Sequence, residues 1–423
     1  MMRSVDSASE RKSTMRRRSL AMSKVSWKIL PRTARSPLVC ARSPLVLSCA
    51  LLLGAIWAGS ARAELPSDTA RGFQSATIPV PASKHWVWVN DFVFPHMADG
   101  MAYLVDGDSG RYLGTLSTGY GYSHLLLSRD GKLIYSPETY FSRGTRGERT
   151  DVVTLYDPAT LGAVGEIAIP PKRSSNLPML GNQILTDDDR FLLIYNFNPS
   201  QGITVVDTKT RKFVREIESP GCALEFPTGP RSFFTVCGDG SLLLVTLDDN
   251  GGAETKRTQP LLSMGDDPVT EKAVRIGRTW YFVTFNGRIL PLEVDAQHAS
   301  VGPIWWLTSE AERKDGWRPG GVQQLAVNAG KSRLYALMHR GGIETHKDPG
   351  KDVWVYDVST RQRVQQFPLK DLASAIQLST DAQPLMYSIY IDKPNLDVYD
   401  AASGKLLRTV ENIGTTPTVM VTP

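Results

Sequence analysis

Short apolar segments separated by polar turns recur along most of the chain. Five of them share one scheme, in which β-branched or aromatic residues run into an aspartate, a turn follows, and a second apolar stretch begins. The aspartates of these five segments are Asp106, Asp157, Asp207, Asp357 and Asp400. Strand-forming residues on both sides of a short polar turn are typical of a β-hairpin, so each segment predicts one hairpin.

The spacing of these hairpins predicts seven repeats. Successive aspartates are 51, 50, 150 and 43 residues apart, and the long gap holds two weaker copies, at Asp248 and Asp295. A second unit, a polar turn followed by an apolar strand such as LTDDDRFLLIYNF, lies between hairpins. Two hairpins per repeat make four strands, which is the content of a propeller blade. The pattern therefore predicts an all-β fold, a single seven-bladed β-propeller of four-stranded blades over residues 64–423.

Helical periodicity is weak along the chain. No long segment repeats its apolar residues every 3.6 positions, which argues against a helical solenoid or a parallel α/β domain. The one helix that we expect lies within residues 307–317, where Thr308 or Ser309 can cap it. The strand HWVWVND, which ends at Asp91, is expected to complete the ring with the C-terminal residues, because closure removes free strand edges.

The first 63 residues differ from the repeats. Basic residues precede the apolar run PLVLSCALLLGAIWAG, which ends in the small residues SARA. This order is typical of a secretory signal, and we expect cleavage after Ala63. An uncleaved anchor is the alternative, although the run is short for a membrane span. We therefore expect an exported protein without a membrane segment.

Removal of the leader changes the charge of the chain. Of its 48 Lys and Arg residues, twelve precede residue 64, whereas only two of its 43 Asp and Glu residues do. The net charge of +5 thus becomes about −5 for the remainder. Because a basic surface is the usual mark of proteins that bind nucleic acid or anionic lipid, we expect neither partner.

Two cysteines, Cys222 and Cys237, remain beyond the leader, fifteen residues apart. An exported protein works where disulfides persist, and a bridge over this distance would contribute roughly 3 kcal/mol in the chain-entropy model. Two separate buried thiols are the alternative. Metal binding is disfavoured, because no CxxC motif or histidine cluster accompanies the cysteines and no histidine belongs to an HxH or HExxH arrangement.

Catalytic motifs are missing from the repeats. The sequence has no GxSxG elbow, P-loop or dinucleotide fingerprint in a strand-turn-helix context. Two expected loops, FSRGTRGERTD and KDGWRPGG, combine the residue types that are enriched at protein interfaces. Their candidate interface residues are Arg143, Arg146, Arg149, Trp317 and Arg318. The alternative is that these are solvated loop charges beside a packed tryptophan. The residues alone thus predict an exported binding or scaffold subunit.

Four further stretches carry a resemblance to a known family. They are TRGERTDVV, GCALEFPTGPRSFFTVCGDGSL, WRPGG and YDAASGKLLRTV. In this order they resemble the heavy subunit of the amine dehydrogenases that use tryptophan tryptophylquinone, over essentially the whole chain after the leader. VNDFVFPH, IPPKRSS, DDPVTEK and MHRGGIETHK look more like the aromatic (aralkyl) amine branch, whereas DGWRPGG is closer to the methylamine branch.

The resemblance implies a periplasmic α2β2 enzyme. Its light subunit would carry the quinone, made from two of its own tryptophans, and the catalytic base, so this chain would hold no catalytic residue, cofactor or metal. A primary amine would leave as aldehyde and ammonia, and electrons would pass to a blue-copper protein of the azurin or amicyanin type. The alternatives are a methylamine dehydrogenase heavy subunit and a non-catalytic periplasmic propeller that binds a ligand or protein.

The resemblance also implies roles for individual residues. It implies a disulfide between Cys222 and Cys237. It implies that a phenylalanine near the first blade lines the substrate channel, and the matching residue in NDFVFPH is Phe94, with Phe92 as the neighbouring alternative. The tryptophans of this chain would be core or interface residues rather than cofactor precursors.

Overall fold

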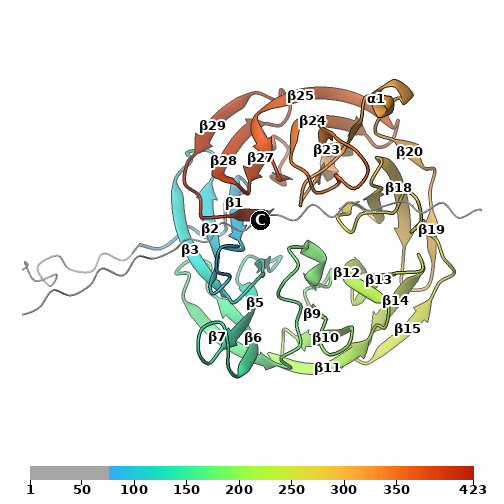
Figure 1. The fold of residues 1–423 in the computed structure, drawn as a ribbon. Helices are drawn as coiled ribbons and strands as arrows, with labels where there is room; N and C mark the ends of the chain where they lie inside the picture. The colour runs from blue at the N-terminus through green and yellow to red at the C-terminus, as the bar shows by residue number, and fades with distance from the viewer. Residues whose placement is uncertain (1–75) are drawn as a thin grey trace, which may run out of the picture. The chain divides into compact units, whose positions relative to one another are not determined.

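The described part of the chain forms a ring of seven β-sheets around a central axis. The computed structural model describes residues 76–423, and the predicted leader, residues 1–63, lies outside them. Figure 1 looks down the axis and shows the sheets following one another round the ring in chain order. The predicted seven-bladed β-propeller is therefore confirmed.

Each blade is an antiparallel sheet that runs from an inner strand at the axis to an outer strand at the rim. From inner to outer strand, blade 1 consists of β30 (Pro417–Val421), β1 (Trp86–Asp91), β2 (Gly100–Asp106) and β3 (Tyr112–Gly119). Blade 2 consists of β4 (Leu126–Leu127), β5 (Ile134–Phe141), β6 (Arg149–Tyr156) and β7 (Ala163–Ile169), and blade 3 of β8 (Gln183–Leu185), β9 (Phe191–Asn196), β10 (Gly202–Asp207) and β11 (Lys212–Glu218). Blade 4 consists of β12 (Cys222–Gly229), β13 (Ser232–Cys237), β14 (Leu242–Leu247) and β15 (Ala253–Arg257).

Blades 5 and 6 have an extra short strand, and blade 7 is regular. The strands of blade 5 are β16 (Val274–Ile276), β17 (Thr279–Val283), β18 (Arg288–Val294) and β19 (Ala299–Val301), with β20 (Trp305–Trp306) also paired to β18. In blade 6, β21 (Trp317–Pro319) and β22 (Leu325–Asn328) pair with successive parts of β23 (Arg333–Arg340), which is followed by β24 (Gly350–Asp357) and β25 (Gln362–Ala373). Blade 7 consists of β26 (Ala375–Leu378), β27 (Leu385–Tyr390), β28 (Lys393–Asp400) and β29 (Leu406–Val410).

The ring is closed by its two ends. The C-terminal strand β30 is the inner strand of blade 1 and pairs antiparallel with β1, with Val89 opposite Met420 and Trp88 opposite Val421. This pairing confirms the closure expected from HWVWVND. It leaves β1 without a free inner edge, which is the reason that propellers join their ends.

The aspartates that revealed the repeat hold the hairpin turns. Asp157 follows β6, and its Oδ1 accepts hydrogen bonds from the backbone N–H groups of Ala159 at 2.7 Å and Thr160 at 3.0 Å. A short carboxylate can satisfy turn N–H groups in this way, which favours Asp at the start of a turn. The same bond to a following N–H group recurs at the other six repeat aspartates, Asp106, Asp207, Asp248, Asp295, Asp357 and Asp400.

The core lies between neighbouring blades. One cluster joins Tyr135 and Val153 of blade 2 to Leu192 and Val206 of blade 3, and all four side chains are buried. Strands β9 and β10 are buried at every residue, because each is covered on both faces by the adjacent blades. This burial on both faces explains why the sequences of β9 and β10 are nearly continuous apolar runs.

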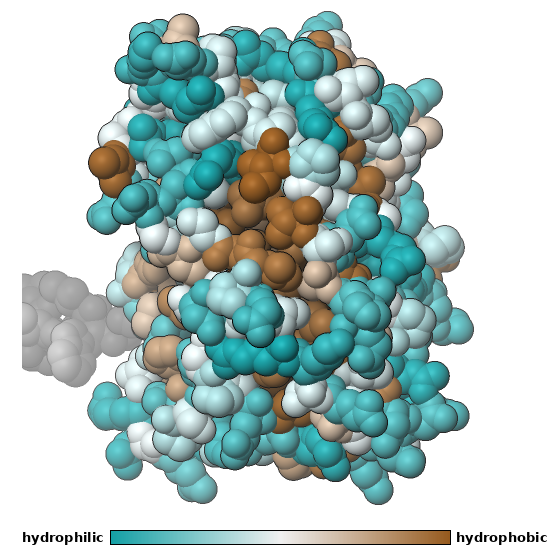
Figure 2. All heavy atoms as spheres, turned by 90° about the vertical axis from the view of Figure 1, so that its right-hand side faces the viewer, coloured by the Kyte–Doolittle hydropathy of each residue, from teal (hydrophilic) through white to brown (hydrophobic). Residues whose placement is uncertain are grey.

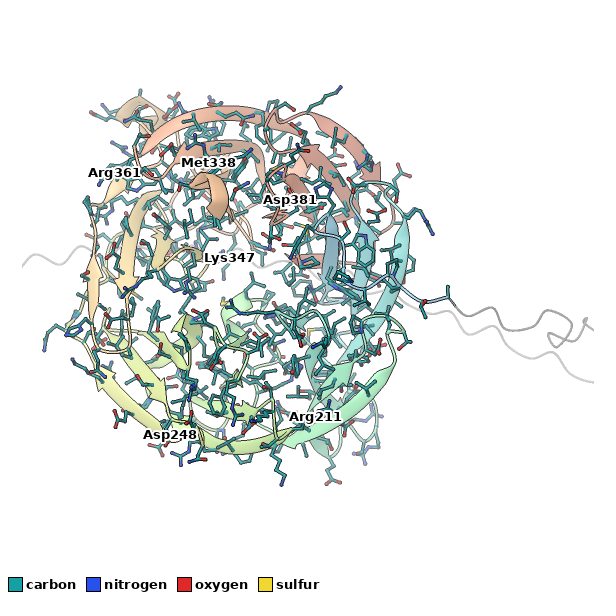
Figure 3. The ribbon with its side chains drawn as sticks, turned by 180° about the vertical axis from the view of Figure 1, so that it is seen from behind. Arg211, Asp248, Met338, Lys347, Arg361 and Asp381 are labelled. Carbon is teal, nitrogen blue, oxygen red and sulfur yellow. A yellow bond between two sulfur atoms is a disulfide. The ribbon has the colours of Figure 1, made fainter. Side chains whose placement is uncertain are left out.

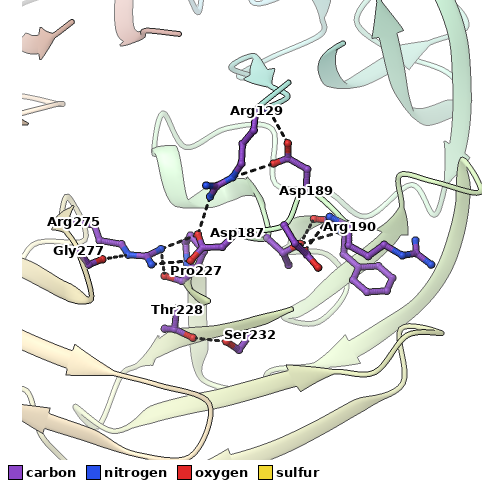
Figure 4. A network of polar contacts seen from close by, with 12 residues as sticks. Arg129, Asp187, Asp189, Arg190, Pro227, Thr228, Ser232, Arg275 and Gly277 are labelled. Carbon is purple, nitrogen blue, oxygen red and sulfur yellow. Dashed lines mark hydrogen bonds and ion pairs between the residues drawn. The ribbon is translucent and has the colours of Figure 1, made fainter. Parts of the chain in front are cut away.

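An ion-pair network ties four consecutive blades together on the face that carries the hairpins between first and second strands (Figure 4). Arg275 of blade 5 binds both oxygens of Asp187 of blade 3, at 2.9 and 2.7 Å, and also donates to the carbonyl of Pro227 in blade 4. Arg129 of blade 2 donates to Asp187 at 3.2 Å, and its backbone N–H donates to Asp189 at 2.6 Å. The network therefore crosses three blade boundaries.

The predicted helix is present but short. Helix α1 spans Glu310–Lys314, and Ser309 caps it in a reciprocal capping box with Glu312. Gly316, with φ at 82°, follows the C-cap residue Asp315 and turns the chain out of the helical conformation. Within residues 76–423, no helix is long and apolar enough to cross a membrane.

One side of the ring exposes apolar side chains. Figure 2 shows them gathered across the middle of the side that carries β18–β20, with hydrophilic groups around them. Two residues of this segment, Ile304 and Trp306, are 50% and 41% exposed, and the guanidinium of Arg313 lies 4.1 Å from the centre of the Trp306 ring. The rim of blade 5 therefore presents an apolar area with a cation at its border.

Candidate functional site

Phe94 lies on one end of the propeller, which we call the Phe94 face. This face consists of the connections between second and third strands and the connections between blades, among them residues 92–99, 170–179, 258–273 and 341–349. The Phe94 ring is 44% exposed, and the Phe94 N–H donates to Thr416 Oγ1 at 2.9 Å. Its position at the surface is compatible with the predicted channel role, which stays a prediction.

Aromatic rings lead from Phe94 into the protein interior. Phe92, the neighbouring alternative, is only 3% exposed, and its ring lies edge-on to Phe94 at 4.5 Å. Tyr122 follows at 5.9 Å from Phe92, and its hydroxyl lies 3.0 Å from His124 Nδ1. Burial lowers the pKa of His124 to about 3, so this imidazole is neutral near neutral pH. Phe94 is therefore the outermost member of a buried aromatic series.

The buried side chain of Arg173 holds the backbone that carries Tyr122. The guanidinium of Arg173 donates to the carbonyl oxygens of Tyr122 at 2.9 Å and Tyr120 at 3.2 Å, and to Thr139 Oγ1 at 2.8 Å. The Arg173 N–H donates to the buried carboxylate of Asp151 at 3.1 Å. Arg173 thus fixes the connection between blades 1 and 2 against the connection that leads into blade 3.

The predicted interface arginines of blade 2 have different surroundings. Arg143 and Arg146 lie exposed in the connection between β5 and β6. Arg149 instead binds both oxygens of Asp151, at 2.8 and 2.7 Å, and donates to the Arg173 carbonyl at 2.8 Å. Arg149 is therefore engaged within the chain, and of the three arginines only Arg143 and Arg146 offer free positive charge at the surface. The partner interface itself stays a prediction.

Trp317 and Arg318 lie in β21, beside the end of β23. The Trp317 ring packs against buried Trp354, with 5.1 Å between ring centres, and the Arg340 guanidinium lies 5.0 Å from the Trp317 ring centre. Arg318 donates to the Gly342 carbonyl of the Phe94 face. Both residues are partly buried, so they hold this loop in place, whatever further contact they make.

The cysteine pair is a disulfide. Cys222 begins β12 and Cys237 ends β13, directly opposite it in the register. The bridge joins the first two strands of blade 4 at the Phe94 face. Its presence confirms the pairing that the family resemblance implied. Within residues 76–423, no group of three or more His, Cys, Asp or Glu side chains is arranged to hold a metal ion.

A central cavity is a feature that the sequence did not reveal. It has a volume of about 250 Å³ and lies between the inner strands β8, β12, β16, β22, β26 and β30. Figure 3, seen from behind, shows Lys347 of the Phe94 face toward the centre of the ring, while Arg211, Asp248 and Arg361 lie toward its rim. The residues around the cavity come from six blades, so only the closed ring brings them together.

The chain has relatives of known class. The family model of the methylamine dehydrogenase heavy chain matches residues 83–423. The chain belongs to this family. The methylamine dehydrogenase heavy chain of Paracoccus versutus is 34% identical over 327 residues, which cover 76% of this chain and 75% of that protein. That of Methylophilus methylotrophus is 30% identical over 385 residues, covering 89% of this chain and 92% of that protein.

Solved structures agree with the fold. The periplasmic gluconolactonase PpgL of Pseudomonas aeruginosa superimposes with a TM-score of 0.55 at 14% identity, covering 79% of this chain and 98% of that chain. A putative 6-phosphogluconolactonase of Bacteroides fragilis gives a TM-score of 0.55 at 11% identity, covering 81% of this chain and 99% of that chain. At this identity the likeness concerns the fold alone. The heavy-chain family thus supplies the functional class.

Proposed function

We propose that this chain, an amine dehydrogenase heavy chain, belongs to a periplasmic enzyme that prefers aromatic primary amines. The support for this preference is the position of four segments, VNDFVFPH, IPPKRSS, DDPVTEK and MHRGGIETHK, whose sequences look like the aromatic branch. All four lie wholly or partly in connections of the Phe94 face. These segments therefore border the surface to which Phe94 contributes.

Exposed apolar side chains on the Phe94 face support a partner there. Phe94, Leu177, Phe197, Met264 and Ile343 are 44%, 38%, 54%, 38% and 82% exposed, and each lies in a connection at this end of the propeller. Exposed apolar groups that gather on one face are typical of protein contact sites. We propose that the quinone-bearing light subunit docks on this face, in an α2β2 assembly.

The light subunit would supply the chemistry. Oxidative deamination converts a primary amine and water into an aldehyde and ammonia and releases two electrons and two protons. The tryptophan tryptophylquinone of the light subunit would take up these electrons, which would pass singly to a blue-copper protein. Tryptophans of this chain fit packing roles, since Trp86, Trp88, Trp305 and Trp354 are at most 8% exposed. This chain would contribute the scaffold, the docking face and one wall of the substrate channel.

Methylamine is the second candidate substrate. The curated relatives at 30 to 34% identity described above are methylamine dehydrogenase heavy chains, which favours the smaller amine. The two candidates differ in the size of the group that must pass the Phe94 face, so kinetics distinguish them directly.

The test is to purify the chain with its bound partners from its native periplasm and to record the visible spectrum. Phenethylamine and methylamine are then added to separate samples. We expect a small second subunit to co-purify and the quinone absorbance to bleach at a lower concentration of phenethylamine.

Other outcomes have clear meanings. Preferential bleaching by methylamine would replace the aromatic proposal by the second candidate. A chain that purifies alone, without visible absorbance, from a periplasm that shows no amine-dependent dye reduction would contradict both candidates and favour a non-catalytic binding propeller.

A further inference from the structure

A buried carboxylate without a partner lines the central cavity. Glu225, in the inner strand β12, is 0% exposed, and neither of its carboxylate oxygens has a hydrogen-bond partner. Burial raises the pKa of Glu225 well above its usual value. An isolated carboxylate in a protein interior is costly, so its place needs a physical reason.

The backbone is distorted where it delivers this side chain. Strand β12 has an irregular register between Ala223 and Phe226, and Leu224 in between adopts a φ of 64°. Gly181 packs against this bulge so closely that an added Cβ would lie 2.9 Å from Leu224 Cβ. Bulges that redirect a side chain and positive φ values at bulky residues are concentrated at functional sites. The bulge turns Glu225 toward the axis, where it lines the cavity.

The other charges at the cavity are compensated. Arg275 is neutralised by Asp187, which it binds through two hydrogen bonds. Lys272 donates to the carbonyl oxygens of Gly321 at 2.7 Å and His346 at 3.4 Å, and the adjacent Glu271 carboxylate balances its charge. The Glu225 carboxyl group is thus left without a partner of opposite charge among the lining residues, so it becomes a favourable carboxylate only when a cation joins it.

The other buried polar atoms of the cavity lining that lack a partner are also acceptors. Gln324 is fully buried and donates through its amide nitrogen to Thr270 Oγ1 at 3.1 Å, while its Oε1 has no partner. Glu271 Oε1 also lacks a partner, so with the two oxygens of Glu225 the cavity lining holds four free acceptors, enough for the three N–H donors of a primary ammonium group. Phe226, Trp280 and Val419 supply aromatic and aliphatic walls around them.

We infer that the central cavity binds a small primary alkylammonium ion, with its ammonium group on Glu225 and Gln324 and its alkyl group against the apolar wall. A dehydrated metal ion fits less well, because hard cations require six or more oxygen ligands. The cavity volume of about 250 Å³ accommodates an ion of a few carbon atoms. This site does not depend on amine oxidation or on the choice between aromatic amines and methylamine.

The test measures the thermal stability of the intact complex. Wild type and Glu225→Gln are melted in n-propylammonium chloride and in sodium chloride of equal ionic strength. Because a ligand that binds only the folded protein stabilises it, the melting temperature of wild type should rise with propylammonium concentration. The shift should be absent in Glu225→Gln. Glu254→Gln, an exposed change in the same blade, is the matched control and should behave as wild type.

Crystals of the complex soaked in n-propylammonium provide a second readout that does not involve stability. The four-atom ion should appear in wild type with its nitrogen in hydrogen-bond distance of Glu225 and Gln324. Two results would overturn the inference. One is a cavity that holds only water in soaked wild-type crystals. The other is an equal propylammonium-dependent melting shift in wild type and Glu225→Gln.

Discussion

At the scale of single residues, the two phenylalanines of NDFVFPH divide their roles. Phe92 is buried in the aromatic series, whereas Phe94 ends it at the surface. Removing a side chain from a substrate channel changes discrimination between large and small substrates by about tenfold or more. We expect Phe94→Ala to shift the ratio of kcat/KM for phenethylamine to that for methylamine by this amount, without loss of quinone absorbance.

The matched control is Phe213→Ala, which removes a comparably exposed ring from the rim strand β11. This variant should leave the kcat/KM ratio as in wild type. An unchanged ratio in Phe94→Ala would refute the channel role.

His85 predicts a pH-dependent contribution to stability. Its Nδ1 lies 2.8 Å from Asp108 and its Nε2 lies 2.6 Å from Asp381, so the ring joins turns of blades 1 and 7. Partial burial lowers the pKa of His85, but the hydrogen bond and charge of Asp108 and the charge of Asp381 outweigh it and raise the pKa overall. The stabilisation is therefore complete below the unfolded pKa of about 6.5 and is lost as pH rises through the folded value.

Thermal melts of wild type and His85→Gln at several pH values test this. The melting temperature of the variant should fall below that of wild type at about pH 5 and approach it at about pH 9. His298→Gln, an exposed control, should follow wild type. A difference between wild type and His85→Gln that is constant with pH would contradict the charged role of His85.

At the scale of elements, the ion-pair network of Figure 4 links blades 2 to 5 through Asp187. Asp187→Asn keeps the size of the side chain but leaves Arg275 without its counter-charge. Both groups are only partly screened by solvent, so we expect a loss of about 1–2 kcal/mol in the free energy of unfolding, measured by urea titration. Asp130→Asn, which removes an exposed pair with Lys132, should lower the free energy of unfolding less than Asp187→Asn does.

The elements that could be predicted from the sequence are those formed by interactions between residues close together in the chain. The hairpins were visible in the sequence because Asp157 and its counterparts satisfy N–H groups two or three residues away. The helix at residues 307–317 was also visible, from its local cap, but Gly316 shortened it. The orientation of Glu225 was not predictable from the sequence. Strict alternation in CALEFPTG places its side chain on the face of the strand that Leu224 and Phe226 do not share, and only the bulge redirects it.

The interface arginines show the same limit. Arg149 looks like Arg143 and Arg146 in the sequence, yet it alone reaches Asp151, which lies two residues along the same strand, and the Arg173 carbonyl of another connection. Phe94 was located by family resemblance, since composition and periodicity do not separate it from Phe92.

At the scale of the whole molecule, stability depends on the pairing of β1 with β30. Deletion of residues 417–423 would expose the inner edge of β1 and remove Val419 and Met420 from the core. Because the blades support one another round the ring, we expect the truncated chain to lose its cooperative thermal transition, followed by circular dichroism. Removal of Pro423 alone, which lies outside β30, should preserve the transition. A truncated chain with a native melting curve would show that the ring does not need this strand.

The same closure sets an order of assembly. Blade 1 begins with β1, the first described strand, and is completed by β30. It therefore lacks its inner strand until the other six blades have been synthesised. Thr416, which accepts the Phe94 N–H, and Val419, which lines the cavity, arrive in this final step. A chain that is interrupted during synthesis would therefore lack Thr416 and Val419 together, and the proposed docking of a light subunit on the Phe94 face would select for finished rings.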